Sequence, residues 1–352
     1  MTGAAGYLGG HLVRELIRAG EHNIYCMIHS DEQKLFGNLE YLFGASWLNA
    51  NRRKLIPVKG EITSENMGIG GEALPELTAR VHTVIHAAAD VRHYGARCES
   101  VRINVGGTEN AIKLCRDAGA KLLYISTMSN SGEYIVDDPA REAVFTEDDT
   151  DIGQNWRDNI YVNSKFLAEQ AVNAAIEQGL DGKVFRVGRL VGRSEDGVFQ
   201  KNREKNSFYL FVKGLVALDC IPAEFAGTLI EMTPVDECAR GIVALRNSEG
   251  RVFHMFNPYQ MPLRDFVAAL GKHMAEVSRE EYESALAKAA LTEPPQVMAQ
   301  LLDVWNRIKL QNFVIRIDNR KTTERLRSVG LAWSRPELSV WLAAFDVTDG
   351  GR

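Results

Sequence analysis

The sequence predicts an α/β fold with a doubly wound parallel sheet, together with a smaller, mostly helical C-terminal region. Two observations lead to this prediction. Apolar, β-rich runs alternate with helix-like segments through the first half of the 352-residue chain, and a glycine-rich loop at residues 3–9 precedes the first helical pattern. Strand–helix alternation is typical of parallel sheets covered by helices on both faces. Ligands of such sheets gather at the carboxyl ends of the strands.

The expected elements follow the chain in order. The first helix should cover residues 9–18, because Leu12, Leu16 and Ile17 share one face and Gly20 can end it. Further helices are expected at 105–118 and 164–178. The expected strands are residues 23–28, 54–58, 81–86, 121–126, 183–187 and 251–256.

The pattern changes after Phe199. Helical stretches follow, separated by Ser278 and by the loop at residues 292–295. We therefore expect a first domain at residues 1–198, to which the strand at 251–257 returns, and a mostly helical substrate region at 199–352. The helical stretches of this region are residues 207–218, 262–275, 279–290 and 296–308.

The start of the chain departs from the pattern. A glycine-rich loop of this kind should follow a strand, yet only Met1 and Thr2 precede Gly3. A sheet without its central strand would leave backbone groups of two neighbouring strands unpaired. We therefore expect that the first strand is missing, because the chain was cut from a longer polypeptide or its start was misassigned. A genuinely shorter sheet is the alternative.

Composition and charge match those of a soluble globular protein, with 45% apolar residues, 25% charged residues and a net charge of −5. The acidic balance offers no basic footprint for nucleic acid, and no apolar stretch approaches the roughly 20 residues that span a bilayer. The cysteines have an odd count and no metal-ligand spacing, so we expect reduced thiols in a cytoplasmic protein and no metal site. They are Cys26, Cys98, Cys115, Cys220 and Cys238.

The glycine-rich loop predicts a dinucleotide site. Its glycines let the backbone approach a pyrophosphate, and the following helix presents its N-terminal N–H groups to that anion, as in the Rossmann fold. The residues expected to contact the cofactor here are Thr2, Gly3, Ala5, Gly6, Tyr7 and Leu8.

The residues after the strand at 23–28 bear on the choice of cofactor. An acidic residue about 20 positions after the glycines would bind the ribose diol of NAD. His29 and Ser30 stand there instead, with acidic residues just beyond them. A missing carboxylate favours a 2′-phosphorylated cofactor, NADPH, because a carboxylate would repel the phosphate. The candidate partners of the phosphate are His29, Ser30 and Lys34.

Other strand ends add to the expected cofactor shell. Glu61 and Ile62 follow a strand, where they either flank the adenine or simply close the strand. His86 is expected to be a hydrogen-bonded core histidine, and Asn104 to cap a helix. The remaining residues expected in the shell are Ala87, Ala88 and Ala89, with small side chains at a strand tip, Asn104 itself, and Gly188.

Tyr161 and Lys165 carry the strongest chemical signal. They lie four residues apart in an expected helix, so they share a face, and the ammonium of Lys165 can lower the pKa of the phenol. Thr127 directly follows the strand at 121–126 and can donate a hydrogen bond to a substrate carbonyl, although capping is an alternative role. We interpret Tyr161 as the general acid. Lys165 would stabilise its phenolate and contact the nicotinamide ribose. Together, the three residues predict a nicotinamide-dependent oxidoreductase.

These motifs resemble the extended short-chain dehydrogenase/reductase family. The match continues into the terminal thioester reductase domains of nonribosomal peptide synthetases, which are relatives of carboxylic acid reductases. The Tyr and Lys motif is common to the superfamily, whereas the Ser126-Thr127 strand end and the C-terminal segments favour thioester reductases. The supporting segments are residues 2–9, 58–62, 67–69, 84–91, 104–108, 125–129, 161–165, 185–192, 233–236, 254–258, 318–322 and 330–331.

The resemblance implies an acyl or peptidyl thioester substrate on the phosphopantetheine arm of a carrier protein, in the same polypeptide. NADPH would reduce it through a hemithioacetal to an aldehyde, and a second hydride would give an alcohol. Thr127, Tyr161 and Lys165 match the family's catalytic triad, and the region at 199–352 would bind the carrier protein. Two positions depart from the family, which usually has Arg where His29 stands and Asp where Glu61 stands.

Two other classes stay open at this point. A sugar-nucleotide epimerase or dehydratase would retain NAD and need a nucleotide-binding cap, and the missing acid near His29 weighs against it. A cofactor-sensing binding protein could use the same fold without catalysis. The presence of Thr127, Tyr161 and Lys165 together favours an enzyme.

Overall fold

The computed structural model describes residues 1–21, 23–29, 31–93, 95–270, 274–310, 314–335 and 337. The chain forms two compact units. The first comprises Met1–Gly188, Val235–Phe256 and Phe313–Ala332, and the second comprises Arg189–Pro234, Asn257–Asn312 and Trp333–Arg352.

This division differs from the expected boundary after residue 198. Residues 189–198 join the second unit, and two later segments return to the first, not the strand at 251–257 alone. The returning helix α9 (Val235–Leu245) packs on α1 (Tyr7–Arg18), and β11 (Val252–Met255) extends the sheet beside β6 (Gly182–Val187). The last segment adds β14 (Ile315–Ile317), which pairs with β5 (Ala143–Phe145), and α13 (Arg320–Ser328), which packs on α9.

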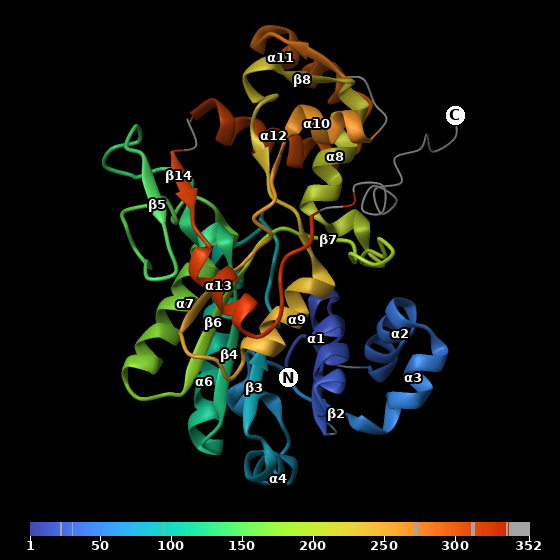
Figure 1. The fold of residues 1–352 in the computed structure, drawn as a ribbon, viewed down its shortest axis with the longest axis vertical. Helices are drawn as coiled ribbons and strands as arrows, with labels where there is room; N and C mark the ends of the chain where they lie inside the picture. Colours follow the sequence, from blue (N-terminus) through green and yellow to red (C-terminus); the bar gives the residue numbers. More distant parts are fainter. Residues whose placement is uncertain are drawn as a thin grey trace. The chain divides into compact units, whose positions relative to one another are not determined.

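The first unit contains the predicted parallel α/β sheet, in two hydrogen-bonded groups. One pairs β1 (Ile24–Ile28) with β2 (Leu55–Lys59). The other has the order β11-β6-β4-β3, with β3 at Thr83–His86 and β4 at Lys121–Thr127, and all its pairs are parallel. In Figure 1, β3, β4 and β6 lie side by side. The strand predictions hold to within two residues at each end.

Met1 and Thr2 occupy the place between the two groups, where the first strand was expected. The Met1 ammonium donates to the carbonyl of Tyr25 at 2.6 Å, and the Met1 carbonyl accepts from the N–H of Met27 at 2.8 Å. On the other side, the N–H of Thr2 donates to the carbonyl of Ile85 at 2.9 Å, and Thr2 forms a parallel bridge with His86. These two residues therefore join β1 to β3.

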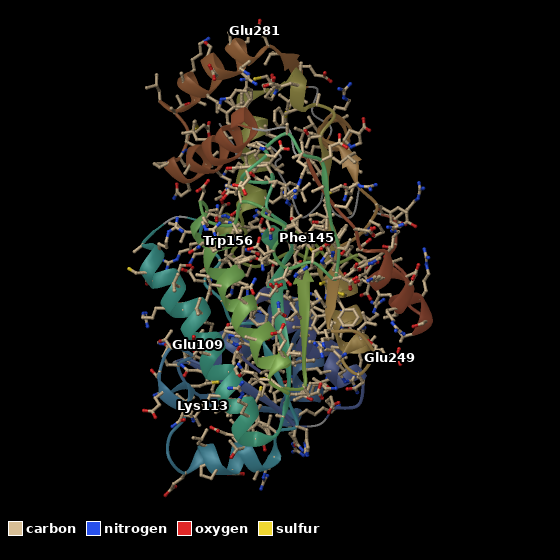
Figure 2. The ribbon with its side chains drawn as sticks, turned by 90° about the vertical axis from the view of Figure 1, so that its left-hand side faces the viewer. Glu109, Lys113, Phe145, Trp156, Glu249 and Glu281 are labelled. Carbon is tan, nitrogen blue, oxygen red and sulfur yellow. The ribbon has the colours of Figure 1, made fainter. Side chains whose placement is uncertain are left out.

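The helices of the first unit bury apolar faces against the strands. α6 (Gly107–Ala118) and α7 (Ile160–Glu177) share one core with the strands. That core includes Leu122, Tyr124 and Val184 from the sheet and Ala111, Cys115, Ala168 and Val172 from the helices. The opposite face of α6 carries the exposed Glu109 and Lys113 (Figure 2). The remaining helices of this unit are α2 (Glu32–Phe43), α3 (Ala45–Asn51), α4 (Ala73–Arg80) and α5 (Arg97–Val101), which continues through a π-helical turn (Arg102–Gly106) into α6.

The second unit is mostly helical, as predicted. Its helices are α8 (Ser207–Leu218), α10 (Leu263–Ala269), α11 (Arg279–Ala289) and α12 (Pro295–Leu310). α8 packs on α12, where a side chain at Gly214 would lie 2.6 Å from Leu301. Its short strands pair β7 (Leu190–Val191) with β10 (Thr233–Pro234), β8 (Cys220–Pro222) with β13 (Ala275–Val277), and β9 (Leu229–Ile230) with β12 (Met261–Pro262).

One helix of the second unit is shorter than expected. The predicted helix at 262–275 ends at Ala269, and Ala275 belongs to β13, where it pairs with Cys220. Short 3-10 turns complete the two units at Arg52–Lys54, Glu65–Gly68, Met128–Ser131, Arg203–Lys205 and Ala223–Phe225. Within the described ranges, no helix is both long enough and apolar enough to cross a membrane.

Candidate active site

The glycine-rich loop is packed too closely for other side chains. Gly3 has a φ of +72°, in the left-handed region, and a Cβ there would lie 2.7 Å from the carbonyl carbon of Ala87. A Cβ on Gly9 would lie 1.9 Å from the carbonyl oxygen of Gly3. Gly6 is the N-cap of α1 and brings no capping side chain, and the first turn of α1 contains no acidic residue. A bare loop that leads into a helix N-terminus fits the pyrophosphate of a dinucleotide. Thr2, Ala5, Tyr7 and Leu8 belong to this same loop and first turn.

Thr2 connects the loop to the end of β3. Its Oγ1 lies 2.8 Å from Nδ1 of His86 and accepts from the N–H of Ala88 at 3.1 Å. His86 is buried, and desolvation together with the charge of Lys165 lowers its pKa to about 3. It is therefore the neutral, hydrogen-bonded core histidine that the sequence predicts. Ala87, Ala88 and Ala89 follow it as half-buried residues, the first two beside the backbone of Gly3.

The segments that follow β1 and β2 meet through an unexpected contact between His29 and Glu61. Nε2 of His29 lies 2.8 Å from Oε2 of Glu61, and these side chains are 76% and 37% exposed. The sequence lacks an acidic residue at position 29 itself, and the structure brings a carboxylate to His29 from the segment that follows β2. Burial would raise the pKa of Glu61, but hydrogen bonds from the N–H and hydroxyl of Thr63, together with His29, lower it overall.

Four other residues of the expected cofactor shell lie as follows. Lys34 is exposed in the first turn of α2, and Ser30 lies outside the described residues. Ile62 is half-buried and packs against Gly107, where an added Cβ would approach its Cδ1 to 3.0 Å. Gly188 follows β6 and donates its N–H to the carbonyl of Met255 at 3.0 Å.

Asn104 has a different role from the expected helix cap. It lies inside the π-helical turn and is buried. Its Oδ1 accepts from the N–H of Asp90 at 2.7 Å, and its Nδ2 donates to the carbonyl of Asp90 at 2.9 Å and to Oγ of Ser164 at 2.8 Å. Asn104 therefore ties the loop after β3 to α7. Single-turn π-helices inside α-helices are frequent at functional sites.

Thr127 and Tyr161 meet at the end of β4. Thr127 is buried, and its Oγ1 accepts from the N–H of Ser129 at 3.2 Å, so it caps the turn that follows, the role expected as an alternative. Tyr161 begins α7, whose N-cap is Asn159. Burial raises the pKa of the Tyr161 phenol, and the neighbouring hydroxyl of Thr127 acts in the opposite direction without cancelling that rise.

Lys165 lies one turn further along α7 and is buried. Its Nζ donates to the hydroxyl of Tyr124 at 2.7 Å and to the carbonyl of Ile125 at 2.8 Å. Burial lowers its pKa to about 7, although Glu169 acts in the opposite direction. From the sequence we expected Lys165 to lower the pKa of Tyr161. In this structure the phenol has a raised pKa, because its desolvation dominates, and the described hydrogen bonds of Nζ go to β4.

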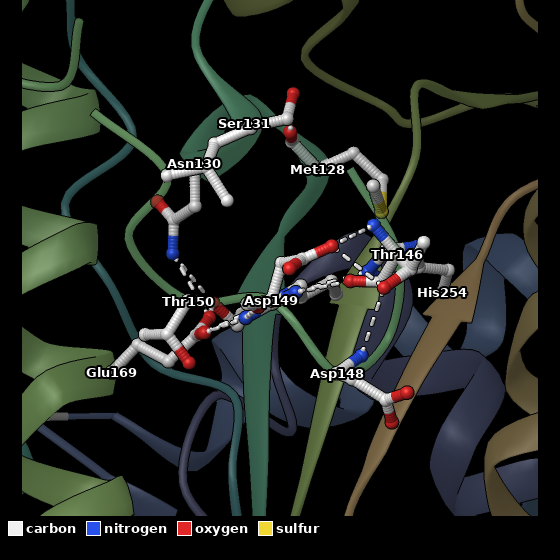
Figure 3. Close-up of polar contacts among 12 residues, drawn as sticks. Met128, Asn130, Ser131, Thr146, Asp148, Asp149, Thr150, Glu169 and His254 are labelled. Carbon is white, nitrogen blue, oxygen red and sulfur yellow. Dashed lines mark hydrogen bonds and ion pairs between the residues drawn. The ribbon is translucent and has the colours of Figure 1, made fainter. Parts of the chain in front are cut away.

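A buried polar network behind Thr127 was not expected from the sequence. Oε1 of Glu169 accepts from Nη2 and Nε of Arg186 at 2.6 Å and 2.9 Å, and both side chains are almost fully buried. Oε2 of Glu169 accepts from the hydroxyl of Ser126 and from Nδ2 of Asn130 (Figure 3). Ser126 directly precedes Thr127, so the network holds the end of β4. A signal existed, because Glu169 lies one turn beyond Lys165 and Arg186 interrupts an apolar strand.

The network extends to the returning segments of the first unit. Nη1 of Arg186 lies 3.0 Å from Nε2 of His254, on β11, and Nη2 donates to the carbonyl of Asp149 at 2.7 Å. Nδ1 of His254 lies 2.6 Å from the carbonyl of Asp318, which fixes the proton on Nδ1 and leaves Nε2 to accept from Arg186. Burial, together with the charge of Arg186, lowers the pKa of His254 to about 4.

Other site chemistries find no support among the residues that the structure describes. There, no group of three or more His, Cys, Asp or Glu side chains is arranged to hold a metal ion. All five cysteines are free thiols. Four are buried, and Cys98 is exposed.

Comparisons with known proteins show the family and the fold. Residues 1–242 match the model of an NAD-binding family described as male sterility protein. The solved thiolation-reductase di-domain from an archaeal non-ribosomal peptide synthetase is 30% identical, with a TM-score of 0.84, over 98% of this chain and 74% of that one. The reductase domain of the aureusimine biosynthetic cluster is 27% identical, with a TM-score of 0.81, over 98% and 87% of the two chains.

Curated relatives are much longer than this chain. A linear gramicidin synthase protein of Brevibacillus parabrevis is 28% identical over 299 residues, which are 82% of this chain and 6% of that protein. The chain spans between 6% and 26% of the length of the curated relatives it matches. With its glycine-rich loop and its Thr, Tyr and Lys arrangement, the chain belongs to the NAD-binding family described as male sterility protein, alongside the reductase domains of nonribosomal peptide synthetases.

Proposed function

We propose that this protein reduces an acyl or peptidyl thioester, carried on the phosphopantetheine arm of a carrier protein, to an aldehyde with NADPH. The observation that carries the proposal is the buried Thr127 at the carboxyl end of β4, with Tyr161 beside it and the buried Lys165 one helical turn further along α7. The glycine-rich loop follows Thr2, which is joined to the end of the neighbouring β3. Relatives described as reductase domains and as a thiolation-reductase di-domain support the thioester substrate.

The residues divide the chemistry as follows. NADPH, when bound, supplies the hydride that adds to the thioester carbonyl carbon. Tyr161 gives its phenolic proton to the carbonyl oxygen, and the Thr127 hydroxyl donates a hydrogen bond to the same oxygen. The product of this step is a hemithioacetal. When its O–H proton leaves, the C–S bond breaks, the aldehyde forms and the sulfur takes up a proton as a free thiol. A second hydride would convert the aldehyde into an alcohol.

We assign Lys165 to the electrostatics of this step and to the nicotinamide ribose. Its pKa of about 7 allows Nζ to exchange a proton near neutral pH, and its bonds to Tyr124 and Ile125 hold it against β4. We assign pyrophosphate binding to Gly3, Gly6 and the first turn of α1, and the adenine end to Glu61 and Ile62.

We propose NADPH over NADH because His29 and Lys34 bring potential positive charge to the ends of β1 and α2. The carboxylate of Glu61 holds His29 at 2.8 Å and so competes with the 2′-phosphate for the imidazole. We therefore expect a moderate preference for NADPH. We assign binding of the substrate and its carrier protein to the second unit, in line with the region expected at residues 199–352.

Incubation with acyl-pantetheine thioesters tests the proposal. The protein is supplied with NADPH or NADH, the loss of reduced-cofactor absorbance is followed, and the product is identified by mass spectrometry. We expect aldehyde or alcohol and free pantetheine in amounts that match the cofactor consumed. Conversion of a nucleotide sugar without net cofactor consumption would instead indicate an epimerase or dehydratase. Cofactor binding without turnover of either substrate class would indicate a cofactor-sensing protein.

A further inference from the structure

His93 lies beside the proposed general acid, in the loop that joins β3 to α5. Its ring centroid is 5.0 Å from that of Tyr161, and the two ring planes are inclined by 51°. No sequence motif marks this histidine, which is 68 positions away from Tyr161 in the chain. The contact is aromatic, so it bears on the ring of Tyr161 and not on its hydroxyl.

Asn159 fixes the imidazole and the start of α7 together. Its Oδ1 accepts from the N–H groups of Tyr161 and Val162 at 3.0 Å and 3.1 Å, so the amide orientation is determined by two backbone donors. Its Nδ2 therefore faces His93, 3.1 Å from Nδ1. An NH₂ group can only donate, so Nδ1 must accept, and the neutral ring carries its proton on Nε2.

The loop around His93 is held at further points. Arg97 donates to the carbonyl of Arg157 at 2.6 Å and to that of Asp158 at 3.3 Å, which ties the start of α5 to the segment before α7. On the other side of His93, Asp90 is bound through its N–H and carbonyl by Asn104. His93 is therefore set between two fixed points of the backbone.

We propose that His93 is a positioning residue for Tyr161. Its neutral imidazole, oriented by Asn159, packs against the phenol and fixes the tilt of the ring. Tyr161 must deliver its proton to one atom of the substrate. Fixing its ring should raise the rate, because small misplacements of a reacting group slow a reaction by large factors. This inference rests on the proposed role of Tyr161.

Substitutions at position 93 separate its two contacts. His93→Ala removes both, His93→Asn retains an acceptor in the place of Nδ1, and His93→Phe retains a ring against Tyr161. We expect His93→Ala to lower kcat for thioester reduction roughly 10-fold to 100-fold, with KM and the Kd of NADPH changed less than about threefold. His93→Asn and His93→Phe should each recover part of the loss. His82→Ala, which changes an exposed histidine beside β3, is the matched control and should retain wild-type kcat.

A double variant decides whether His93 acts through the phenol. In a Tyr161→Phe background, where the proton donor is gone, adding His93→Ala should cause no further loss of kcat. An equal loss in both backgrounds, or wild-type kcat in His93→Ala, would overturn the inference. Thermal melting of every variant shows whether a loss of kcat reflects unfolding. If kcat across the variants simply follows Tm, the positioning role of His93 is overturned. Wild-type activity in Tyr161→Phe itself would overturn the proposed function, a result that the double variant does not mimic.

Discussion

Two corners of the first unit carry polar side chains at the carboxyl ends of strands, and they differ in burial. In the catalytic corner, formed by Thr127, Tyr161 and Lys165, Thr127 is 7% exposed and Lys165 only 3%. In the ribose corner, formed by His29, Lys34 and Glu61, the side chains of His29 and Glu61 are 76% and 37% exposed. A buried charge must be held by fixed partners, whereas an exposed charge is screened by water. Changes in the catalytic corner should therefore have large effects, and changes in the ribose corner graded ones.

The largest expected effect is that of Tyr161→Phe. It removes the proton donor and retains the ring, so kcat for thioester reduction should fall by roughly 10²–10⁴-fold while folding and NADPH binding persist. Thr127→Val should cost roughly 10²-fold or more by removing one donor to the developing oxyanion. Steady-state kinetics and cofactor titration measure both, and the losses in a double variant should not add. Near-wild-type turnover in Tyr161→Phe would leave the catalytic assignment without support.

The next effect concerns the network behind Thr127. Glu169→Gln removes the charge that pairs with the fully buried Arg186, so the free energy of unfolding should fall by about 3–5 kcal/mol. Urea denaturation measures the change. Glu109→Gln, on the exposed face of α6, is the control and should change stability by less than about 0.5 kcal/mol. A similar small change in both variants would show that the network does not hold the end of β4.

A smaller effect is a pH dependence that comes from Lys165. Its pKa of about 7 in the folded protein lies below the unfolded value of about 10.4. The unfolded state therefore binds more protons between these values, and the contribution of Lys165 to stability rises with pH from about 7 to about 10. At lower pH the cost of burying the ammonium is present in full, and at higher pH the amine is neutral in both states.

Lys165→Met should remove this rise. Urea unfolding at pH 7 and pH 9 should show a gain in stability for the wild type that exceeds that of the variant by roughly 2 kcal/mol. Lys288→Met, at an exposed position of α11, should keep the wild-type difference. Equal pH dependence in Lys165→Met and the wild type would mean that Lys165 does not titrate in this range.

The smallest effect is expected in the ribose corner. Lys34→Ala removes an exposed charge near the proposed 2′-phosphate and should weaken NADPH binding only. The dissociation constant of NADH divided by that of NADPH should therefore fall by only a few-fold, because exposed ion pairs are weak. Isothermal titration calorimetry with both cofactors measures this ratio. The difference in the ratio between the wild type and Lys34→Ala should shrink at high salt. Equal dissociation constants of NADPH and NADH for the unmodified protein would contradict the preference itself.

Tertiary pairing explains what the sequence-based expectations missed. Glu61, which follows β2, brings a carboxylate to His29 because β1 and β2 pair in parallel with their ends in register. Asn104 was expected to cap a helix, yet the helix continues through it and its amide binds Asp90 instead. Neither contact leaves a local pattern, since its partners are 32 and 14 positions apart in the sequence.

The sequence by itself determined the α/β alternation, the glycine-rich loop and the placement of Tyr161 and Lys165 on one helical face. Each depends on spacing within a few residues, which backbone geometry converts directly into structure. Only the tertiary structure decided that Lys165 bonds to Tyr124 and Ile125, that His93 packs on Tyr161, and that two segments beyond residue 234 return to the first unit. Those contacts join residues far apart in the chain, and they form because burial of the shared core brings the strand ends together, where each buried polar group must then find a partner.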